Sequence, residues 1–228
     1  MELSKEQALI LKTLQEKDAL KQQVYQRTEE AYEMLQQAVE RVFQLLDRQV
    51  RTWPEPRPKV LLQEKGKHEI SLTFGADVLV FNHHSNVFQF ERSHSVWQSS
   101  YLREDEGRSF CGVIQIYNFL HDSIALHRQQ DLGYMIARIF VNKEGHYFVE
   151  GKRQLGFLYN NFSQAEVSVD ELSRVVESCM LYTLDFDLLV PNYDQVKIVS
   201  VEDLHRHHAH MSMGTTGKRL GFTFEADL

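Results

Sequence analysis

The stretch LGYMIARIFVNKEGHYFVEGK, residues 132–152, decides the fold. Apolar runs rich in aromatic and β-branched residues lie on both sides of NKEG (142–145), as expected for two paired β-strands joined by a tight turn. Asn142 opens this turn, and Gly145 can adopt the left-handed conformation that ends a type I turn with a bulge. We therefore predict an antiparallel hairpin centred on NKEG.

Other segments with the pattern of β-strands lie on both sides of this hairpin in the sequence. The run FCGVIQIYNF (110–119) is apolar on both faces, which is typical of a central strand, and residues 68–74 alternate. NHHSN (82–86) lies between two further strand-like runs, 77–81 and 87–92, and predicts a second hairpin turn there. Further strand-like runs follow at 156–162, 196–201 and 220–226. A succession of short strands favours a mostly antiparallel sheet.

One helix is expected to cover this sheet. Ser168 and Glu171 have the spacing of a capping box, which marks a helix start. The apolar residues that follow fall on one helical face, and they are Leu172, Val175, Val176, Cys179, Met180 and Thr183. With the long N-terminal helix described next, the sequence predicts an α+β fold in which one main helix packs on the sheet.

The N-terminal segment, residues 1–53, is predicted to be one long amphipathic helix. It has no proline or glycine and is rich in Glu, Gln, Lys, Leu and Ala, which are strong helix formers. A helix of about 50 residues would be about 75 Å long, so part of it should project, bend near residues 17–21 or pair with another chain. The alternative is a hairpin of two helices, 4–18 and 20–52, although the segment between them has no turn-forming residue.

Apolar residues recur along this segment at alternate steps of four and three, most regularly from Val24 onward. This spacing is typical of a coiled coil, so we expect a contact between chains, either in a homo-oligomer or with a protein partner. The expected interface residues are Ala31, Leu35, Ala38, Val42 and Leu45. The alternative is that the same residues pack on the rest of their own chain.

The segment WPEPRP, residues 53–58, should end the long helix. It holds three of the four prolines of the chain, and proline neither continues a helix nor favours helical backbone in the residue before it. We therefore predict a proline hinge at 54–58 and an α+β body at 59–228. Because every predicted strand lies in 59–228, we expect this body to fold without the helix.

Composition narrows the classes of partner and location. The formal charge of −7 argues against nucleic acid as a partner, because the chain lacks the positive excess that neutralises phosphates. No apolar run approaches the roughly 18 residues of a membrane span, so no membrane partner is expected. Both cysteines, Cys111 and Cys179, lie in apolar runs, which favours free thiols and a cytoplasmic location.

The segment HRHHAHMSMG, residues 205–214, raises the question of a metal site. If residues 202–211 form a short helix, each side of it offers only two imidazoles, whereas a closed zinc site needs four ligands. A divalent metal would therefore need further ligands, for example His83 and His84. The candidate metal ligands are His205, His207, His208 and His210. The alternatives are a patch that responds to pH and the polar end of a helix.

A second motif bears on whether the protein is a metal-dependent enzyme. Glu150-Gly-Lys152, with Asp131 before the preceding strand, has residue types used by metal-dependent nucleases. If NKEG is the turn, Glu150 faces residue 137 or 138, and Asp131 lies roughly 20 Å away along the hairpin, too far to share a metal ion.

These observations favour an interaction or assembly protein that self-associates or binds a partner through its N-terminal helix. The first alternative is a metal-dependent hydrolase or nuclease. The second is a sensory domain that binds a small ligand inside the curved sheet. No catalytic residue can be assigned from the sequence.

Overall fold

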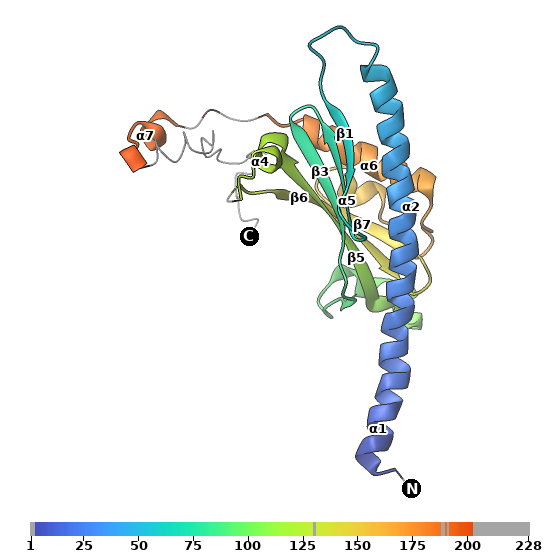
Figure 1. The fold of residues 1–228 in the computed structure, drawn as a ribbon. Coiled ribbons are helices and arrows are strands. Elements are labelled where there is room, and N and C mark those ends of the chain that lie inside the picture. The colour runs from blue at the N-terminus through green and yellow to red at the C-terminus, as the bar shows by residue number, and fades with distance from the viewer. Residues whose placement is uncertain (1–2, 130, 188–189, 191, 203–228) are drawn as a thin grey trace.

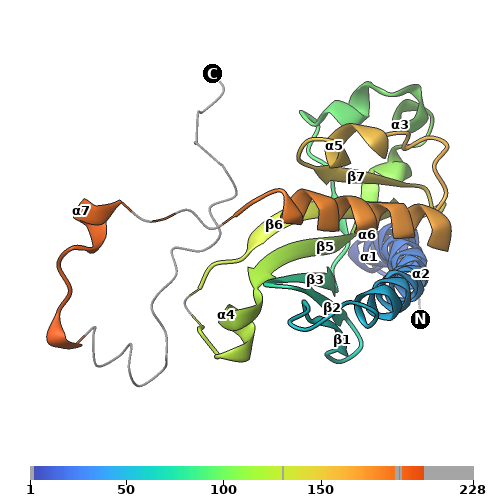
Figure 2. The same cartoon turned by 90° about the horizontal axis from the view of Figure 1, so that it is seen from above.

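The computed structural model describes residues 3–129, 131–187, 190 and 192–202 (Figure 1). A long N-terminal helix runs past an antiparallel sheet, and a second long helix packs on the same sheet (Figures 1 and 2). The predicted α+β class is therefore confirmed.

The long helix is continuous. It consists of α1 (Lys5–Thr13), a π-helical turn (Leu14–Asp18) and α2 (Ala19–Val50). Ser4 caps its start, because its Oγ accepts a hydrogen bond from the Gln7 backbone N–H at 3.1 Å while the Gln7 side chain accepts from the Ser4 N–H. The hairpin of two helices is thus not formed. Instead, the helix continues through the π turn at Leu14–Asp18, which overlaps the start of the expected bend at residues 17–21.

The helix ends before the prolines. Val50 is its last residue, and residues 51–59 connect it to the sheet without further helix or strand. The segment 54–58 therefore has the irregular backbone that its prolines predict.

The sheet has the strand order β1-β2-β3-β5-β6-β7, with all neighbours antiparallel, and the short β4 pairs with β5. Its strands are β1 (Val60–Glu64), β2 (Glu69–Phe74), β3 (Asp77–His83), β4 (Phe88–Gln89), β5 (Phe110–Leu120), β6 (Tyr134–Asn142) and β7 (Tyr147–Gly151). The central position of β5 agrees with the apolar character of both its faces.

The hairpin of β6 and β7 forms as predicted. Arg138 lies opposite Glu150 across it. Gly145 has a φ of 80°, and its N–H donates to the Asn142 carbonyl at 3.0 Å. The turn residues and the flanking apolar runs were both local signals for this hairpin, and they agree.

The prediction of a hairpin at NHHSN is wrong. Both β3 and β4 pair with the same edge of β5, since His83 lies opposite Ile114 and Phe88 lies opposite Cys111. Residues 84–87 are therefore an interruption in a line of two strands, not a turn between paired strands. The length of β5, which is 11 residues, lets one edge serve both.

The main core lies between one face of the sheet and the two long helices. Helix α6 (Val169–Leu184) begins at Ser168, whose Oγ accepts from the Glu171 N–H at 3.2 Å, and all six of its predicted apolar-face residues are buried. Helix α2 crosses β5 at Gly112, where a Cβ atom would lie 2.0 Å from Thr28 Oγ1. Only glycine permits so close an approach of helix and strand.

A smaller second core covers part of the opposite sheet face, which we call the outer face. The connection between β4 and β5 folds over it through two 3-10 turns, Ser95–Gln98 and Glu106–Ser109, and helix α3 (Ser100–Glu104). The buried residues of this core are Tyr101, Leu102, Cys111, Val113, Phe140, Phe148 and Phe162.

The remaining elements are short helices: α4 (His121–Ala125), α5 (Leu155–Leu158) and α7 (Tyr193–Val196). Part of 156–162, read as a further strand, lies in α5. The run 196–201 also reads as a strand, but no strand forms there and Ile198 is 86% exposed. The predicted strand at 220–226 lies outside the described residues.

Candidate functional site

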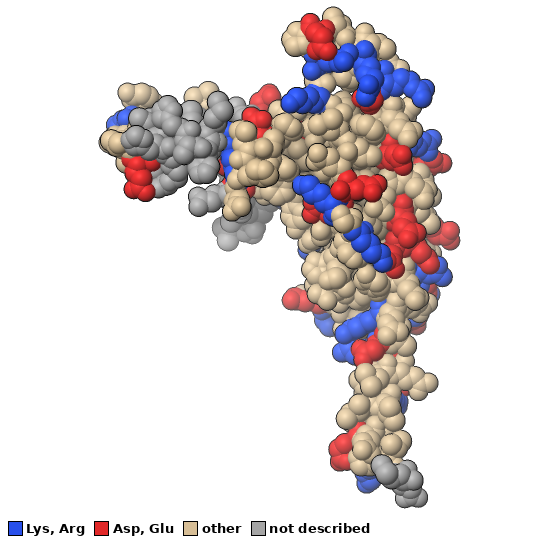
Figure 3. Space-filling model, in the orientation of Figure 1, with Lys and Arg blue, Asp and Glu red and all other residues tan. Residues whose placement is uncertain are grey.

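The N-terminal part of the long helix projects beyond the sheet; we call residues 3–18 the arm (Figures 1 and 3). No residue of α1 or of the π turn is buried, and the first buried residue of α2 is Val24. The arm nevertheless carries large apolar side chains that are 49–65% exposed, which are Leu3, Leu9, Ile10, Leu11 and Leu14. Exposed apolar side chains gathered in this way are unusual on a solvated helix, so the arm is a candidate contact surface.

The apolar residues of the arm are not evenly distributed around the helix. At 100° per residue, Ile10 and Leu14 share one side of the helix, with Leu11 at its margin, whereas Leu9 points away from that side. Leu3 precedes the cap residue Ser4 and lies just outside the helix. The arm carries equal numbers of acidic and basic residues, which are Lys5, Glu6, Lys12, Glu16, Lys17 and Asp18. The arm therefore has no net charge that would repel a second copy of itself.

The predicted interface residues lie elsewhere on the helix. Ala31, Leu35, Ala38 and Val42 are at most 4% exposed, and they belong to the chain's own main core, with the sheet and α6 as their neighbours. A heptad pattern shows which residues are buried, and these four are already covered within one chain. Only Leu45 is exposed, at 54%.

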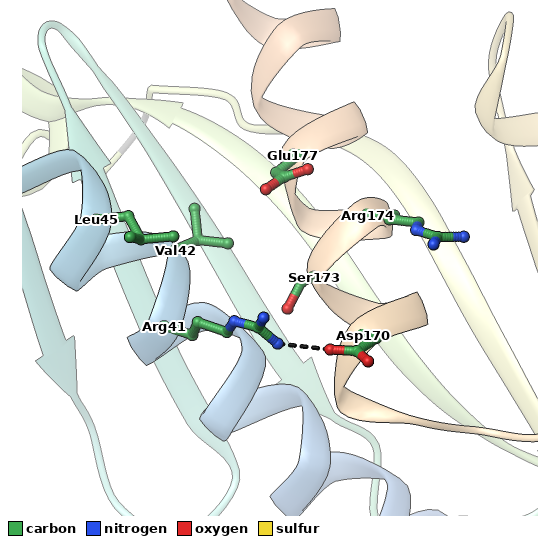
Figure 4. A pocket seen from close by; sticks show the side chains of 7 residues that line it. All are labelled: Arg41, Val42, Leu45, Asp170, Ser173, Arg174 and Glu177. Atoms are coloured by element: carbon green, nitrogen blue, oxygen red, sulfur yellow. Dashed lines mark hydrogen bonds and ion pairs between the residues drawn. The ribbon is translucent and has the colours of Figure 1, made fainter.

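Leu45 lines an open groove between α2 and α6 (Figure 4). The groove has a volume of about 370 Å³, and charged side chains from both helices form its rim. Arg41 donates to Asp170 at 2.5 Å across it, and Arg174 pairs with Glu171 at 2.9 Å. Since these ion pairs already engage the rim, the groove is a weaker candidate for a contact than the arm.

The residues of the nuclease hypothesis have separate partners. The Arg138 Nε donates to Glu150 at 2.6 Å, and the Ser123 hydroxyl donates to Asp131 at 2.6 Å. Among the described residues, no group of three His, Cys, Asp or Glu side chains is arranged to hold a metal ion. His205, His207, His208 and His210 lie outside the described residues.

A pair of histidines, the buried His83 and the partly buried His68, lies where α2 meets the sheet. His83 is 3% exposed, and its ring packs 5.4 Å from the rings of both Tyr25 and Tyr32. Its Nδ1 is 3.3 Å from His68 Nδ1, and its Nε2 is buried with no hydrogen-bond partner in the part of the chain that the structure describes. Burial, reinforced by His68, lowers the pKa of His83 from 6.5 to about 4, against the opposing influence of Glu29.

This pKa predicts acid sensitivity. Neutral His83 is favoured in the folded state, so its contribution to stability is complete above pH 6.5 and is lost as the pH falls toward 4. We expect a loss of about 2–3 kcal/mol over that interval in urea denaturation, which His83→Phe should reduce because phenylalanine keeps the ring and does not titrate. An equal loss in His83→Phe would show that other groups cause it.

The outer face of the sheet carries a pocket at the margin of the second core. It has a volume of about 470 Å³; strands β5, β6 and β7 form its floor, and the segment 88–94 forms its wall. Its lining combines aromatic rings with polar side chains, as in many small-molecule sites.

Sequence reasoning missed both the pocket and the His68–His83 pair. A strand at 110–119 places Val113 and Gln115 on one face because they are two residues apart, and His83 and His84 were already candidate metal ligands. However, the signal was incomplete, because the partners of these residues are set by the strand order rather than by local spacing.

Comparison with protein families, curated proteins and solved structures finds no match. Within the described ranges, no helix combines the length and the apolar character needed to cross a membrane.

Proposed function

We propose that this protein is an assembly module that pairs with a second copy of itself through the arm, residues 3–18. The observation that carries the proposal is the stripe of Ile10 and Leu14, on a helical segment with no buried residue, together with Leu3 just before the helix cap. All three side chains are about half exposed. An isolated helix of this length is only marginally stable in water, whereas pairing would bury the stripe.

A second copy fits this surface better than an unrelated partner. The heptad steps through Leu3, Gln7, Ile10 and Leu14 are those of a two-stranded coiled coil, in which identical stripes meet. The equal numbers of acidic and basic residues on the arm allow complementary pairs between copies. In the view of Figure 3, much of the surface of the arm is uncharged.

The mass in solution tests this proposal. Size exclusion coupled to light scattering should give about twice the single-chain mass of 26.8 kDa at micromolar concentration. Ile10→Glu combined with Leu14→Glu should give the single-chain mass, because charges in the seam would be buried without partners. Thermal unfolding of the body should change little, since neither residue is buried.

Leu9→Glu is the matched control. Leu9 is adjacent to Ile10 and is similarly exposed, but it points away from the stripe. It should therefore leave the dimer intact. A single-chain mass for the wild type, or equal effects of the two sets of substitutions, would contradict self-association through the stripe.

We place this assembly in the cytoplasm. Cys111 and Cys179 are both free and fully buried, and burial raises the pKa of both thiols, so neither is poised to form a disulfide. Buried free thiols are common in a reducing compartment.

A further inference from the structure

The pocket on the outer face has a floor with two chemically different halves. Val113 lies opposite Phe140 and forms its apolar half. One step along the same face, Gln115 lies opposite Arg138, which in turn lies opposite Glu150, and these three form its polar half. A ligand on this floor would contact an apolar surface and a hydrogen-bonding row at the same time.

The wall of the pocket adds flat aromatic surface. The Phe90 ring lies 4.9 Å from Phe140, and the Phe88 ring lies 4.8 Å from that of His84. Phe88 is 44% exposed although it lines the pocket. A planar ring in the pocket would cover this exposed surface by stacking or edge contacts.

The polar half has side-chain atoms that remain able to form hydrogen bonds with a ligand. Gln115 lines the pocket, and its side chain makes no hydrogen bond with any described residue, so its amide can donate and accept together. Arg138 and Glu150 bond each other but are 40% and 45% exposed, which leaves atoms of both accessible. A ligand whose edge carries adjacent hydrogen-bond donors and acceptors is complementary to these three side chains.

The charge of the lining excludes strongly anionic ligands. Two carboxylates, Glu91 and Glu150, face one guanidinium, that of Arg138, so the lining has an excess of one negative charge when its histidines are neutral. A phosphate or carboxylate on the ligand would be repelled.

We propose that this pocket binds an uncharged planar heteroaromatic molecule of the nucleobase type. Its ring lies against Phe88, Phe90 and Phe140, and its edge forms paired hydrogen bonds with Gln115. A glutamine amide is complementary to an adenine edge, because the two present matching donors and acceptors. The volume of about 470 Å³ accommodates a bicyclic ring with room for a substituent.

Titration of the full chain with adenine, followed by saturation-transfer NMR and calorimetry, tests this inference. We expect saturable binding at concentrations below the millimolar range. Gln115→Leu should weaken it about tenfold or more, the effect of losing a paired contact to the base edge. Adenosine monophosphate should bind more weakly than adenine, and Glu91→Gln should narrow that difference.

Gln63→Leu is the matched control, since Gln63 lies on the same face but on the edge strand β1, away from the pocket lining. It should leave adenine binding unchanged, and thermal unfolding would establish that both variants fold. The proposal is overturned if adenine shows no saturable binding at millimolar concentration, or if the two glutamine variants behave alike. Equal affinity for adenosine monophosphate would overturn the preference for an uncharged ligand.

Discussion

Residues 59–228, expressed without the long helix, are expected to show no cooperative unfolding transition. The proline segment suggests a separable body, but the packing gives a physical reason for the opposite result. Helix α2 buries nine of its residues, and its partners on the sheet include Ile114, Ile116 and Leu72. Removing the helix would expose this face to water, at a cost of roughly 25 cal/mol for each Å² of apolar surface.

A shorter truncation separates the two parts of the helix. Residues 19–228 lack the arm but keep every buried residue of α2, so this fragment should unfold cooperatively and nearly as the full chain does. Far-UV circular dichroism during heating measures both fragments. A cooperative transition in 59–228 would restore the proline segment as a true domain boundary.

Local signals in the sequence were sufficient to predict two parts of the fold, the β6–β7 hairpin and helix α6. The prediction of the β6–β7 hairpin rests on two apolar runs and on the turn residues Asn142 and Gly145, all within one short stretch. The buried face of α6 follows from helical periodicity and from the cap at Ser168. In both, the information that sets the structure lies within a few residues.

Local signals did not predict which segments of the chain pack or pair with each other. A stripe with helical period looks alike whether a sheet or a second helix covers it, so the spacing of Leu35 and Val42 could not identify their neighbours. NHHSN has the composition of a hairpin turn, but it joins two strands that lie along one edge of β5.

The pocket could not be predicted from the sequence for a related reason. Gln115 and Glu150 are distant in sequence, and they line one floor only because β6 lies between β5 and β7. A single sequence indicates that strands exist, but it does not fix their order. Residues that meet through strand order therefore have no common local signal.

Two leucines of the predicted interface should respond very differently to the same substitution. Leu35 is fully buried between the helix and the sheet, whereas Leu45 is 54% exposed. Leu35→Lys should destabilise the folded chain by about 4 kcal/mol or more, because it places an unpaired charge in the core. Leu45→Lys should change the free energy of unfolding by about 0.5 kcal/mol or less.

Urea denaturation measures both effects, and Leu35→Ala provides a milder variant if the lysine prevents folding. Leucine-to-alanine changes in a core cost about 2–5 kcal/mol, so this variant should remain folded but be clearly weakened. Its mass by light scattering should equal that of the wild type, because the arm is untouched. If Leu35 instead lined a contact between chains, its substitution would lower the mass and leave the unfolding of each chain nearly unchanged.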